Sequence, residues 1–410
     1  MSEASVARQG GGRRAALGFI LASVAFDAMS FGLILPLLPR LILELCGGSS
    51  GDAARAVGVI AAIWAAMNFL AAPVLGVLSD RFGRRPVILI SAFGFSADLA
   101  VMALAPTLGW LFLGRAISGV TAASNATAAA YIADITPPEQ RAQRFGLFSA
   151  TFGAGMILGP ALGGILGAVD PRAPFWLASA VALGGGLYGF FILPESLPRE
   201  RRGAVSWRSA IPVTSYGLLL RDKALAGLAA TSFLMQFAAQ TANNIFVLYT
   251  AYRYGWSTRD VGLLLMAFSA GNMLVQAMIA PRLAATIGPW RTMFLGAALS
   301  GAGLVAGGSS PTGLGFCLAS VALCLGNMFG SALQALCTSR VGPEAQGRLQ
   351  GALSSQAAVA TMAGPLIFTQ VYAWSVSTPN APGGPGLALI CGGALMGCAL
   401  LVGLWARRVA

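Results

Sequence analysis

The chain has 410 residues, of which 56% are hydrophobic and only 10% are charged. An ordinary soluble domain carries roughly 25% charged residues, so the composition excludes a soluble fold. The net charge of +12 could indicate nucleic-acid binding, but the basic residues are spread over short polar segments. The 53 glycines are about twice the usual share, and small residues favour close helix contacts in lipid. We therefore expect a bundle of helices in a lipid bilayer and no nucleic-acid partner.

Apolar runs of about 20 residues are long enough to cross a bilayer as helices. The first run is too long for the core of a signal peptide, so we expect it to remain in the protein. The sequence predicts an all-α membrane protein with twelve transmembrane helices, and an even number places both termini on one side. The runs are 15–38, 55–78, 86–106, 109–131, 145–168, 174–193, 224–250, 260–281, 291–309, 312–337, 348–373 and 385–405.

Basic residues indicate the side on which the loops lie. Of the 26 lysines and arginines, 20 lie in the two termini and in the loops after the even-numbered spans. Cytoplasmic loops are rich in these residues, so both termini are predicted to be cytoplasmic. The longest such loop, 194–223, is predicted to link a six-helix half at 15–193 to a second at 224–405, with tails at 1–14 and 406–410.

An internal repeat supports this division. An offset of 205 residues lays Gly83 on Gly288 and, without a gap, Gly159-Pro160 on Gly364-Pro365. Two related six-helix halves with a pathway between them are typical of secondary transporters.

The segment between the second and third runs, residues 76–86, reads GVLSDRFGRRP. It resembles the signature loop of the major facilitator superfamily, which joins the second and third spans on the cytoplasmic side. We predict that Asp80 pairs with an arginine or a helix N-terminus, and that this pair breaks and forms as the transporter switches states. The alternative is that the arginines only set the topology. Ala285 stands opposite Asp80 in the repeat, so the latch is expected only in the first half. The predicted gating residues are Gly76, Asp80, Arg81, Gly83, Arg84 and Arg85.

Charged residues inside the first-half spans are few: Asp27, Asp98 and Arg115. Charged groups at bilayer depth are costly and usually mark an ion or substrate pathway. Asp27 and Asp98 are therefore predicted to be protonatable coupling residues with Arg115 as their counter-ion, although a structural hydrogen-bonding role is the alternative. The chain has no histidine, and the second-half spans have no internal Asp, Glu or Lys. We therefore expect proton coupling in the first half.

The fifth run contains closely spaced glycines and a proline. Small residues at this spacing favour helix contacts, and the proline should bend the span. The pattern also resembles the antiporter motif of the major facilitator superfamily. Its residues are Gly155, Gly159, Pro160, Gly163 and Gly164.

Uncharged polar residues in the spans are candidates for the substrate pathway. Several are four residues apart and so share one helix face, although hydrogen bonds between helices could account for about half of them. The candidates are Asn68, Gln236, Gln240, Asn243, Asn244, Asn272, Gln276, Gln334 and Gln356.

Together these segments resemble the tetracycline efflux proteins of the drug:proton antiporter family over nearly the whole chain. Further matching stretches are residues 72–87, 131–136, 193–196 and 346–351. The resemblance implies export of tetracycline, as a divalent-metal complex, in exchange for an external proton across the bacterial cytoplasmic membrane, and hence antibiotic resistance. It also implies important roles for Asp27, Asp98 and Arg115. We expect a functional monomer without a cofactor or a protein-bound metal.

Three positions depart from that family's pattern. Asn272 stands where the exporters carry a histidine, Ser300 where they carry an aspartate, and Asn68 where they carry a glutamine. The departures predict an altered proton stoichiometry or another substrate. Two alternatives therefore remain open: an exporter of another amphiphile, metabolite or sugar, and a membrane sensor that transports nothing. An enzyme is disfavoured because no nucleophile and base pair, metal cluster or phosphate loop is evident.

Overall fold

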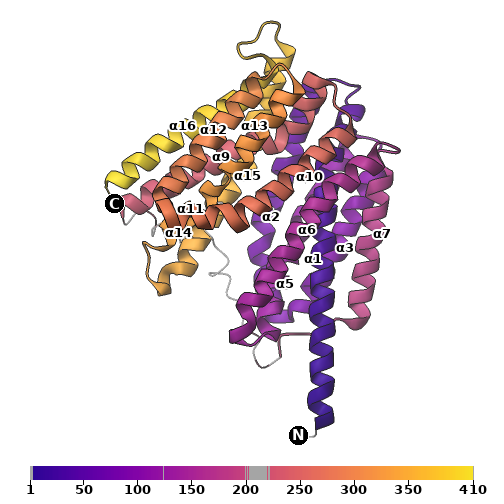
Figure 1. The fold of residues 1–410 in the computed structure, drawn as a ribbon. Helices are drawn as coiled ribbons and strands as arrows, with labels where there is room; N and C mark the ends of the chain where they lie inside the picture. The colour runs from indigo at the N-terminus through magenta and orange to yellow at the C-terminus, as the bar shows by residue number, and fades with distance from the viewer. Residues whose placement is uncertain are drawn as a thin grey trace. The chain divides into compact units, whose positions relative to one another are not determined.

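The computed structural model describes residues 3–122, 124–198 and 222–409, with the single positions 200, 202 and 219. Every regular element in these residues is a helix, so the predicted all-α fold is confirmed (Figure 1). The first half of the chain contains α1 (Glu3–Leu45), α2 (Ser50–Phe82), α3 (Arg84–Leu104), α4 (Leu108–Thr121), α5 (Ser124–Ile135), α6 (Arg141–Gly167) and α7 (Ala173–Ile192). The second half contains α9 (Lys223–Tyr254), α10 (Thr258–Leu274), a π-helical turn (Val275–Ile279), α11 (Ala280–Ile287), α12 (Pro289–Ser309), α13 (Gly313–Gly326), α14 (Met328–Thr338), α15 (Gln346–Ser377) and α16 (Leu387–Arg408).

Ten helical segments in the described part of the chain are long and apolar enough to cross a membrane, and they correspond to ten of the twelve predicted spans. The fourth predicted span is divided, because α4 ends at Thr121 and α5 begins at Ser124. The seventh is the 32-residue helix α9, in which four amide side chains lower the hydropathy. The fourth and seventh spans, and with them the total of twelve, therefore stay predictions.

The 205-residue offset reappears in the backbone. It relates α3 to α12 and α4 to α13 along their whole lengths, and it relates the first residues of α6 and α15. Gly83 and Gly288 precede α3 and α12 with similar backbone angles, φ 108° and ψ 163° against φ 83° and ψ 157°. Only glycine adopts these angles without strain. The repeat is therefore structural as well as sequential.

The chain divides into two compact units. The first unit consists of residues 1–37 and 66–211, and the second consists of residues 38–65 and 212–410. In the first unit α3 packs along α4 and α7, and in the second unit α12 packs along α13 and α16 in the related arrangement (Figure 1). Most of the predicted linker, 194–223, lies outside the described residues.

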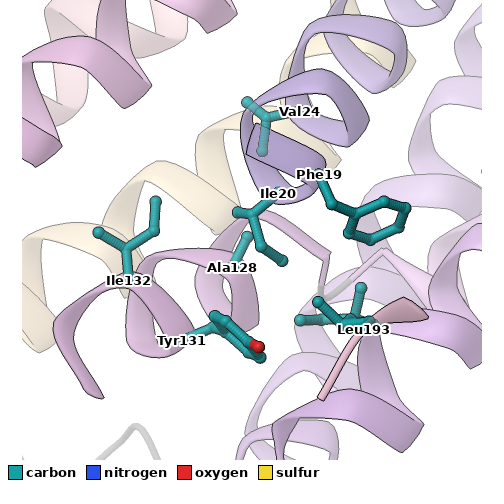
Figure 2. Packing of buried hydrophobic residues seen from close by; sticks show 8 residues of the cluster. Phe19, Ile20, Val24, Ala128, Tyr131, Ile132 and Leu193 are labelled. Atoms are coloured by element: carbon teal, nitrogen blue, oxygen red, sulfur yellow. The ribbon is translucent and has the colours of Figure 1, made fainter. Parts of the chain in front are cut away.

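Buried apolar side chains fix α1 within the first unit. Figure 2 shows Phe19, Ile20 and Val24 of α1 packed with Ala128, Tyr131 and Ile132 of α5 and with Leu193 after α7. The hydroxyl of Tyr131 donates a hydrogen bond to the carbonyl of Pro194 at 2.8 Å, so it has a polar partner at the edge of this apolar cluster. This hydrogen bond joins α5 to the segment that follows α7.

Candidate functional site

Arg84 is the centre of the predicted gating loop. Its guanidinium pairs with the Asp80 carboxylate at 2.6 Å and with Asp134 of α5 at 3.3 Å, and it donates to the Ser79 hydroxyl at 2.6 Å. The side chain of Arg84 is 14% exposed and that of Asp134 is 24% exposed, whereas that of Asp80 is 60% exposed, so the pair with Asp134 is the better shielded from water. The predicted pairing of Asp80 with an arginine is confirmed, and all partners belong to the first unit.

Glu195, which follows α7, also binds this loop. Its carboxylate accepts hydrogen bonds from the backbone N–H groups of Arg84 at 2.8 Å and Arg85 at 3.3 Å, the first two residues of α3. A carboxylate at a helix N-terminus balances unpaired N–H groups and the positive end of the helix dipole. Gly83 is required here, because a Cβ atom at this position would overlap the Glu195 carboxylate.

Sequence reasoning missed Asp134 and Glu195 as loop partners. They lie 50 and 111 residues from Arg84 in the chain, so no local pattern joins them to it. The available signal was that each acid lies within a few residues of the end of an apolar run, where a cytoplasmic arginine cluster would need counter-charges.

The other predicted loop residues form no ion pair among the described contacts of the loop. Arg85 donates to the carbonyl of Phe190 and its guanidinium lies 5.7 Å from the centre of that ring, which is the geometry of a cation–π contact. Arg81 lies 5.3 Å from the ring of Phe82. Around Gly76 the structure has open space, so packing does not explain the glycine.

Asp98 of α3 and Arg115 of α4 form an ion pair inside the first unit. Asp98 is fully buried and Arg115 is 5% exposed. A Cβ atom on Gly114 would lie 2.8 Å from Asp98 Oδ1, so the site has no room for a larger neighbour. Removing one partner of such a pair leaves an uncompensated buried charge, which costs about 3–5 kcal/mol. The predicted pairing of these two residues is confirmed, whereas their role in coupling stays a prediction.

Asp27 lies half-buried in α1, on a stretch that packs against the glycines of α6. A Cβ atom on Gly155 would lie 2.6 Å from the carbonyl oxygen of Ala25 and 2.8 Å from the backbone nitrogen of Met29. Further along, a Cβ atom on Gly159 would lie 2.8 Å from the Cα of Gly32. The glycine pattern therefore lets α6 touch the backbone of α1 on both sides of Asp27.

The remaining antiporter-motif residues extend this contact. Pro160 lies inside α6 beside Gly32, Gly163 lies against Leu33, and Gly164 is buried in the same helix. Asn68 lies half-buried in the part of α2 that belongs to the first unit.

The amides of α9 form hydrogen bonds in the second unit. Asn244 Nδ2 donates to the carbonyl of Gln240 at 2.8 Å and to its side-chain oxygen at 3.3 Å, so this predicted i, i+4 pair is confirmed. Gln240 in turn donates to Thr361 of α15 at 3.4 Å. Gln236 donates to Ser232 of its own helix at 3.0 Å.

Of the other predicted amides, three form no common cluster and two contact Asn327, a residue that the sequence analysis did not identify. Asn243 and Gln334 are exposed, and the side-chain oxygen of Gln356 is buried without a hydrogen-bond partner among the described residues. Asn272 and Gln276 both contact Asn327, which lies where α13 gives way to α14. A single asparagine within an apolar run was the available signal.

A protein-bound metal has no evident ligand set in the described residues, which contain no group of three His, Cys, Asp or Glu side chains that could hold an ion. The six cysteines are all free thiols.

The amino-acid sequence is similar to that of known proteins. The family model described as "Major Facilitator Superfamily" matches residues 20–365. The chain is 40% identical to the class C tetracycline resistance protein of Escherichia coli over 396 residues, which are 96% of this chain and 98% of that protein. It is 38% identical to the class G protein of Vibrio anguillarum over 360 residues, which are 87% of this chain and 90% of that protein.

Solved structures of transporters share the fold. The human organic anion transporter MFSD10 (TETRAN) matches with a TM-score of 0.69 at 22% identity, covering 95% of this chain and 99% of that one. A bacterial homologue of the human lysosomal transporter Spinster matches with a TM-score of 0.77 at 14% identity, covering 97% of each chain. At these identities the likeness concerns the fold alone.

Proposed function

Because this chain belongs to the major facilitator superfamily, we propose that it exports tetracycline-type drugs across the bacterial cytoplasmic membrane and so confers resistance to them. One observation carries the proposal: 40% identity to a tetracycline resistance protein over 96% of the chain. Transport rather than catalysis is the activity proposed, and the transported drug is the only small molecule that the mechanism requires.

Export is driven by protons in this proposal. Asp27 exchanges a proton with the aqueous pathway, and the tight contact of α1 with α6 lets this change in charge act on helix packing. Asp98 is the second protonatable residue in this proposal, and Arg115, paired with it between α3 and α4, is its counter-ion. Supporting this assignment, the described spans of the second unit carry no carboxylate in their interiors.

The drug travels as a complex with a divalent cation, which is cargo and not a resident cofactor. No protein ligand set is then needed, and the pathway amides supply hydrogen-bonding groups for the complex. Asn68, Gln236, Gln240, Asn243, Asn244, Gln334 and Gln356 are the candidates besides those discussed below.

Gating uses the Arg84 network. Opening of the cytoplasmic side requires the contacts of Arg84 with Asp80 and Asp134 to be released or rearranged. In this proposal both termini lie in the cytoplasm and the monomer is the functional unit.

The test is uptake of radiolabelled tetracycline by everted membrane vesicles under an imposed proton gradient. Vesicles with the protein are expected to accumulate the drug, and accumulation is expected to stop when the gradient is collapsed. Asp27→Asn is expected to reduce gradient-driven uptake to the level of vesicles that lack the protein, while membrane insertion stays normal. Full coupled uptake by this variant would contradict the role of Asp27.

A second candidate function is export of another amphiphilic molecule, which is favoured by the uncharged residues Asn272 and Ser300. A drug-susceptibility panel of cells with and without the protein separates the two candidates. Protection against tetracyclines supports the first candidate, and protection only against other compounds supports the second. A sensor that transports nothing would protect against none.

A further inference from the structure

The tenth predicted span is broken at Asn327. α13 ends at Gly326 and α14 begins at Met328. At the break the carbonyl of Asn327 accepts from the N–H of Gly330, three residues on, at 3.2 Å, instead of the α-helical fourth residue. The 205-residue offset relates Asn327 to Ala122, which follows α4 at the matching break in the first repeat. A helix ends at the same place in both repeats, and the residue that follows it is Ala122 in the first and Asn327 in the second.

Two amides of the eighth predicted span meet this break. Asn327 Nδ2 donates to the side-chain oxygen of Asn272 at 3.2 Å, and Gln276 Nε2 donates to the backbone carbonyl of Asn327 at 3.2 Å. Gln276 lies in the π-helical turn Val275–Ile279, a feature found frequently at functional sites. We call Asn272, Gln276 and Asn327 the amide cluster.

Ser300 adds a buried hydroxyl beside the cluster. It lies in α12 with its Oγ buried and without a hydrogen-bond partner among the described residues. A Cβ atom on Gly326 would overlap this hydroxyl, so Ser300 packs directly against the residue before Asn327. Two of the three positions at which this chain departs from the pattern of tetracycline exporters, Asn272 and Ser300, therefore lie at one helix break.

The amide cluster is partly accessible, which a purely structural hydrogen-bonding site in a membrane span would avoid. Asn272 and Asn327 are half-buried and Gln276 is exposed within the described residues. Hydrocarbon offers no hydrogen bonds, so exposed amides at this depth need water or a polar ligand. Each amide offers two donor hydrogens and an acceptor oxygen, so the bonds described above leave capacity for a ligand.

The surroundings of the cluster carry no charge. Residues 261–280, 292–309 and 313–338, which include the cluster and the helix segments around it, contain no Asp, Glu, Lys, Arg or His. A site of this kind selects neutral hydrogen-bonding groups and does not change its charge with pH.

We propose that Asn327, together with Asn272 and Gln276, is a recognition subsite that binds a carbonyl, hydroxyl or carboxamide group of the exported molecule. The subsite rests on the proposed function, because tetracycline is the probe in its test. It determines affinity, whereas the first unit supplies proton coupling.

The test measures KM and maximal rate of tetracycline uptake in everted vesicles for Asn327→Ala, Asn272→Ala, their double variant and Gln276→Ala. Loss of a hydrogen bond to a neutral group predicts a KM raised roughly 3- to 10-fold with a nearly unchanged maximal rate. The two asparagine variants should not be additive, because both remove the same amide–amide bond. Thr338→Ala is the matched control, since its hydroxyl bonds only within α14, to Ala335 at 3.0 Å, and its KM should equal that of the wild type.

The possible outcomes separate the two proposals. Wild-type vesicles that take up no tetracycline overturn the proposed function and the subsite with it. Wild-type uptake with an unchanged KM in all four variants overturns the subsite alone. A fall in maximal rate or in membrane yield without a change in KM assigns the cluster to helix packing and likewise overturns the subsite. If Asn327→Ala does not insert, the exposed Gln276→Ala decides by the same KM criterion.

Discussion

In the first repeat Asp98 and Arg115 form a buried ion pair between α3 and α4, whereas the offset-related positions of the second repeat are Gly303 and Ser320. At the break that follows α4 and α13 the contrast reverses, because the first repeat has Ala122 and the second has Asn327. One backbone plan thus carries charge in one copy and neutral hydrogen-bonding groups in the other. The comparison agrees with the proposed division of labour, in which the first unit carries out proton coupling and the second unit recognises the exported molecule.

The largest expected effect is a loss of stability when one charge of the buried Asp98–Arg115 pair is removed, since the second repeat has no such pair at the related positions. Arg115→Ala leaves Asp98 buried without its counter-charge, so we expect the protein to lose about 3–5 kcal/mol of stability. Thermal unfolding in detergent measures this loss. The double variant Asp98→Asn/Arg115→Gln removes both charges and should be more stable than either single variant. Equal stability of Arg115→Ala and the wild type would contradict a buried pair.

A second change tests how closely α1 and α6 approach beside Asp27. Gly159→Ala places a methyl group 2.8 Å from the Cα of Gly32 and 2.9 Å from the backbone nitrogen of Leu33. Overpacking of this kind costs about 1–3 kcal/mol, and we expect slower transport as well. Gly146→Ala is the matched control on the same helix, because nothing lies within 4 Å of the added methyl. A control as damaging as Gly159→Ala would show that helix propensity, and not contact with α1, explains the effect.

The smallest expected effect concerns the charged network of the gating loop, whose Asp80 and Arg84 are replaced by Ala285 and Pro289 in the second repeat. Glu195→Gln keeps the size of the side chain but removes its charge from the N-terminus of α3, a change worth about 0.3–1 kcal/mol. We expect a small fall in thermal stability that shrinks at high salt, because salt screens the interaction. Glu200→Gln, just beyond the loop partners, controls for the loss of one acid. An effect of Glu195→Gln that does not depend on salt would argue against the helix dipole.

The sequence predicted the parts of this molecule that depend on local composition. Apolar length predicted twelve spans, and ten of them coincide with helices long and apolar enough to cross a membrane. The Gly83–Gly288 correspondence predicted a repeat that the backbone angles support. The pairing of Asp80 with an arginine was also predictable, because three arginines lie within five residues of it in the sequence.

What the sequence did not reveal depends on distance in the chain or on irregular backbone. Glu195 reaches Arg84 only because α7 returns to the same end of the unit as the start of α3. Asn327 was overlooked because one polar residue in an apolar run has no periodicity. Its importance becomes visible only with the helix break and the π-helical turn that bring Asn272 and Gln276 to it.

The most direct test of the division of labour is the number of protons moved per drug molecule, measured in everted vesicles at saturating tetracycline from simultaneous pH and uptake traces. Asn327→Ala should keep the wild-type ratio once its raised KM is exceeded, whereas Asp27→Asn should move no protons in response to the drug. A changed ratio in Asn327→Ala, or a wild-type ratio in Asp27→Asn, would contradict the assignment of coupling to the first unit and recognition to the second.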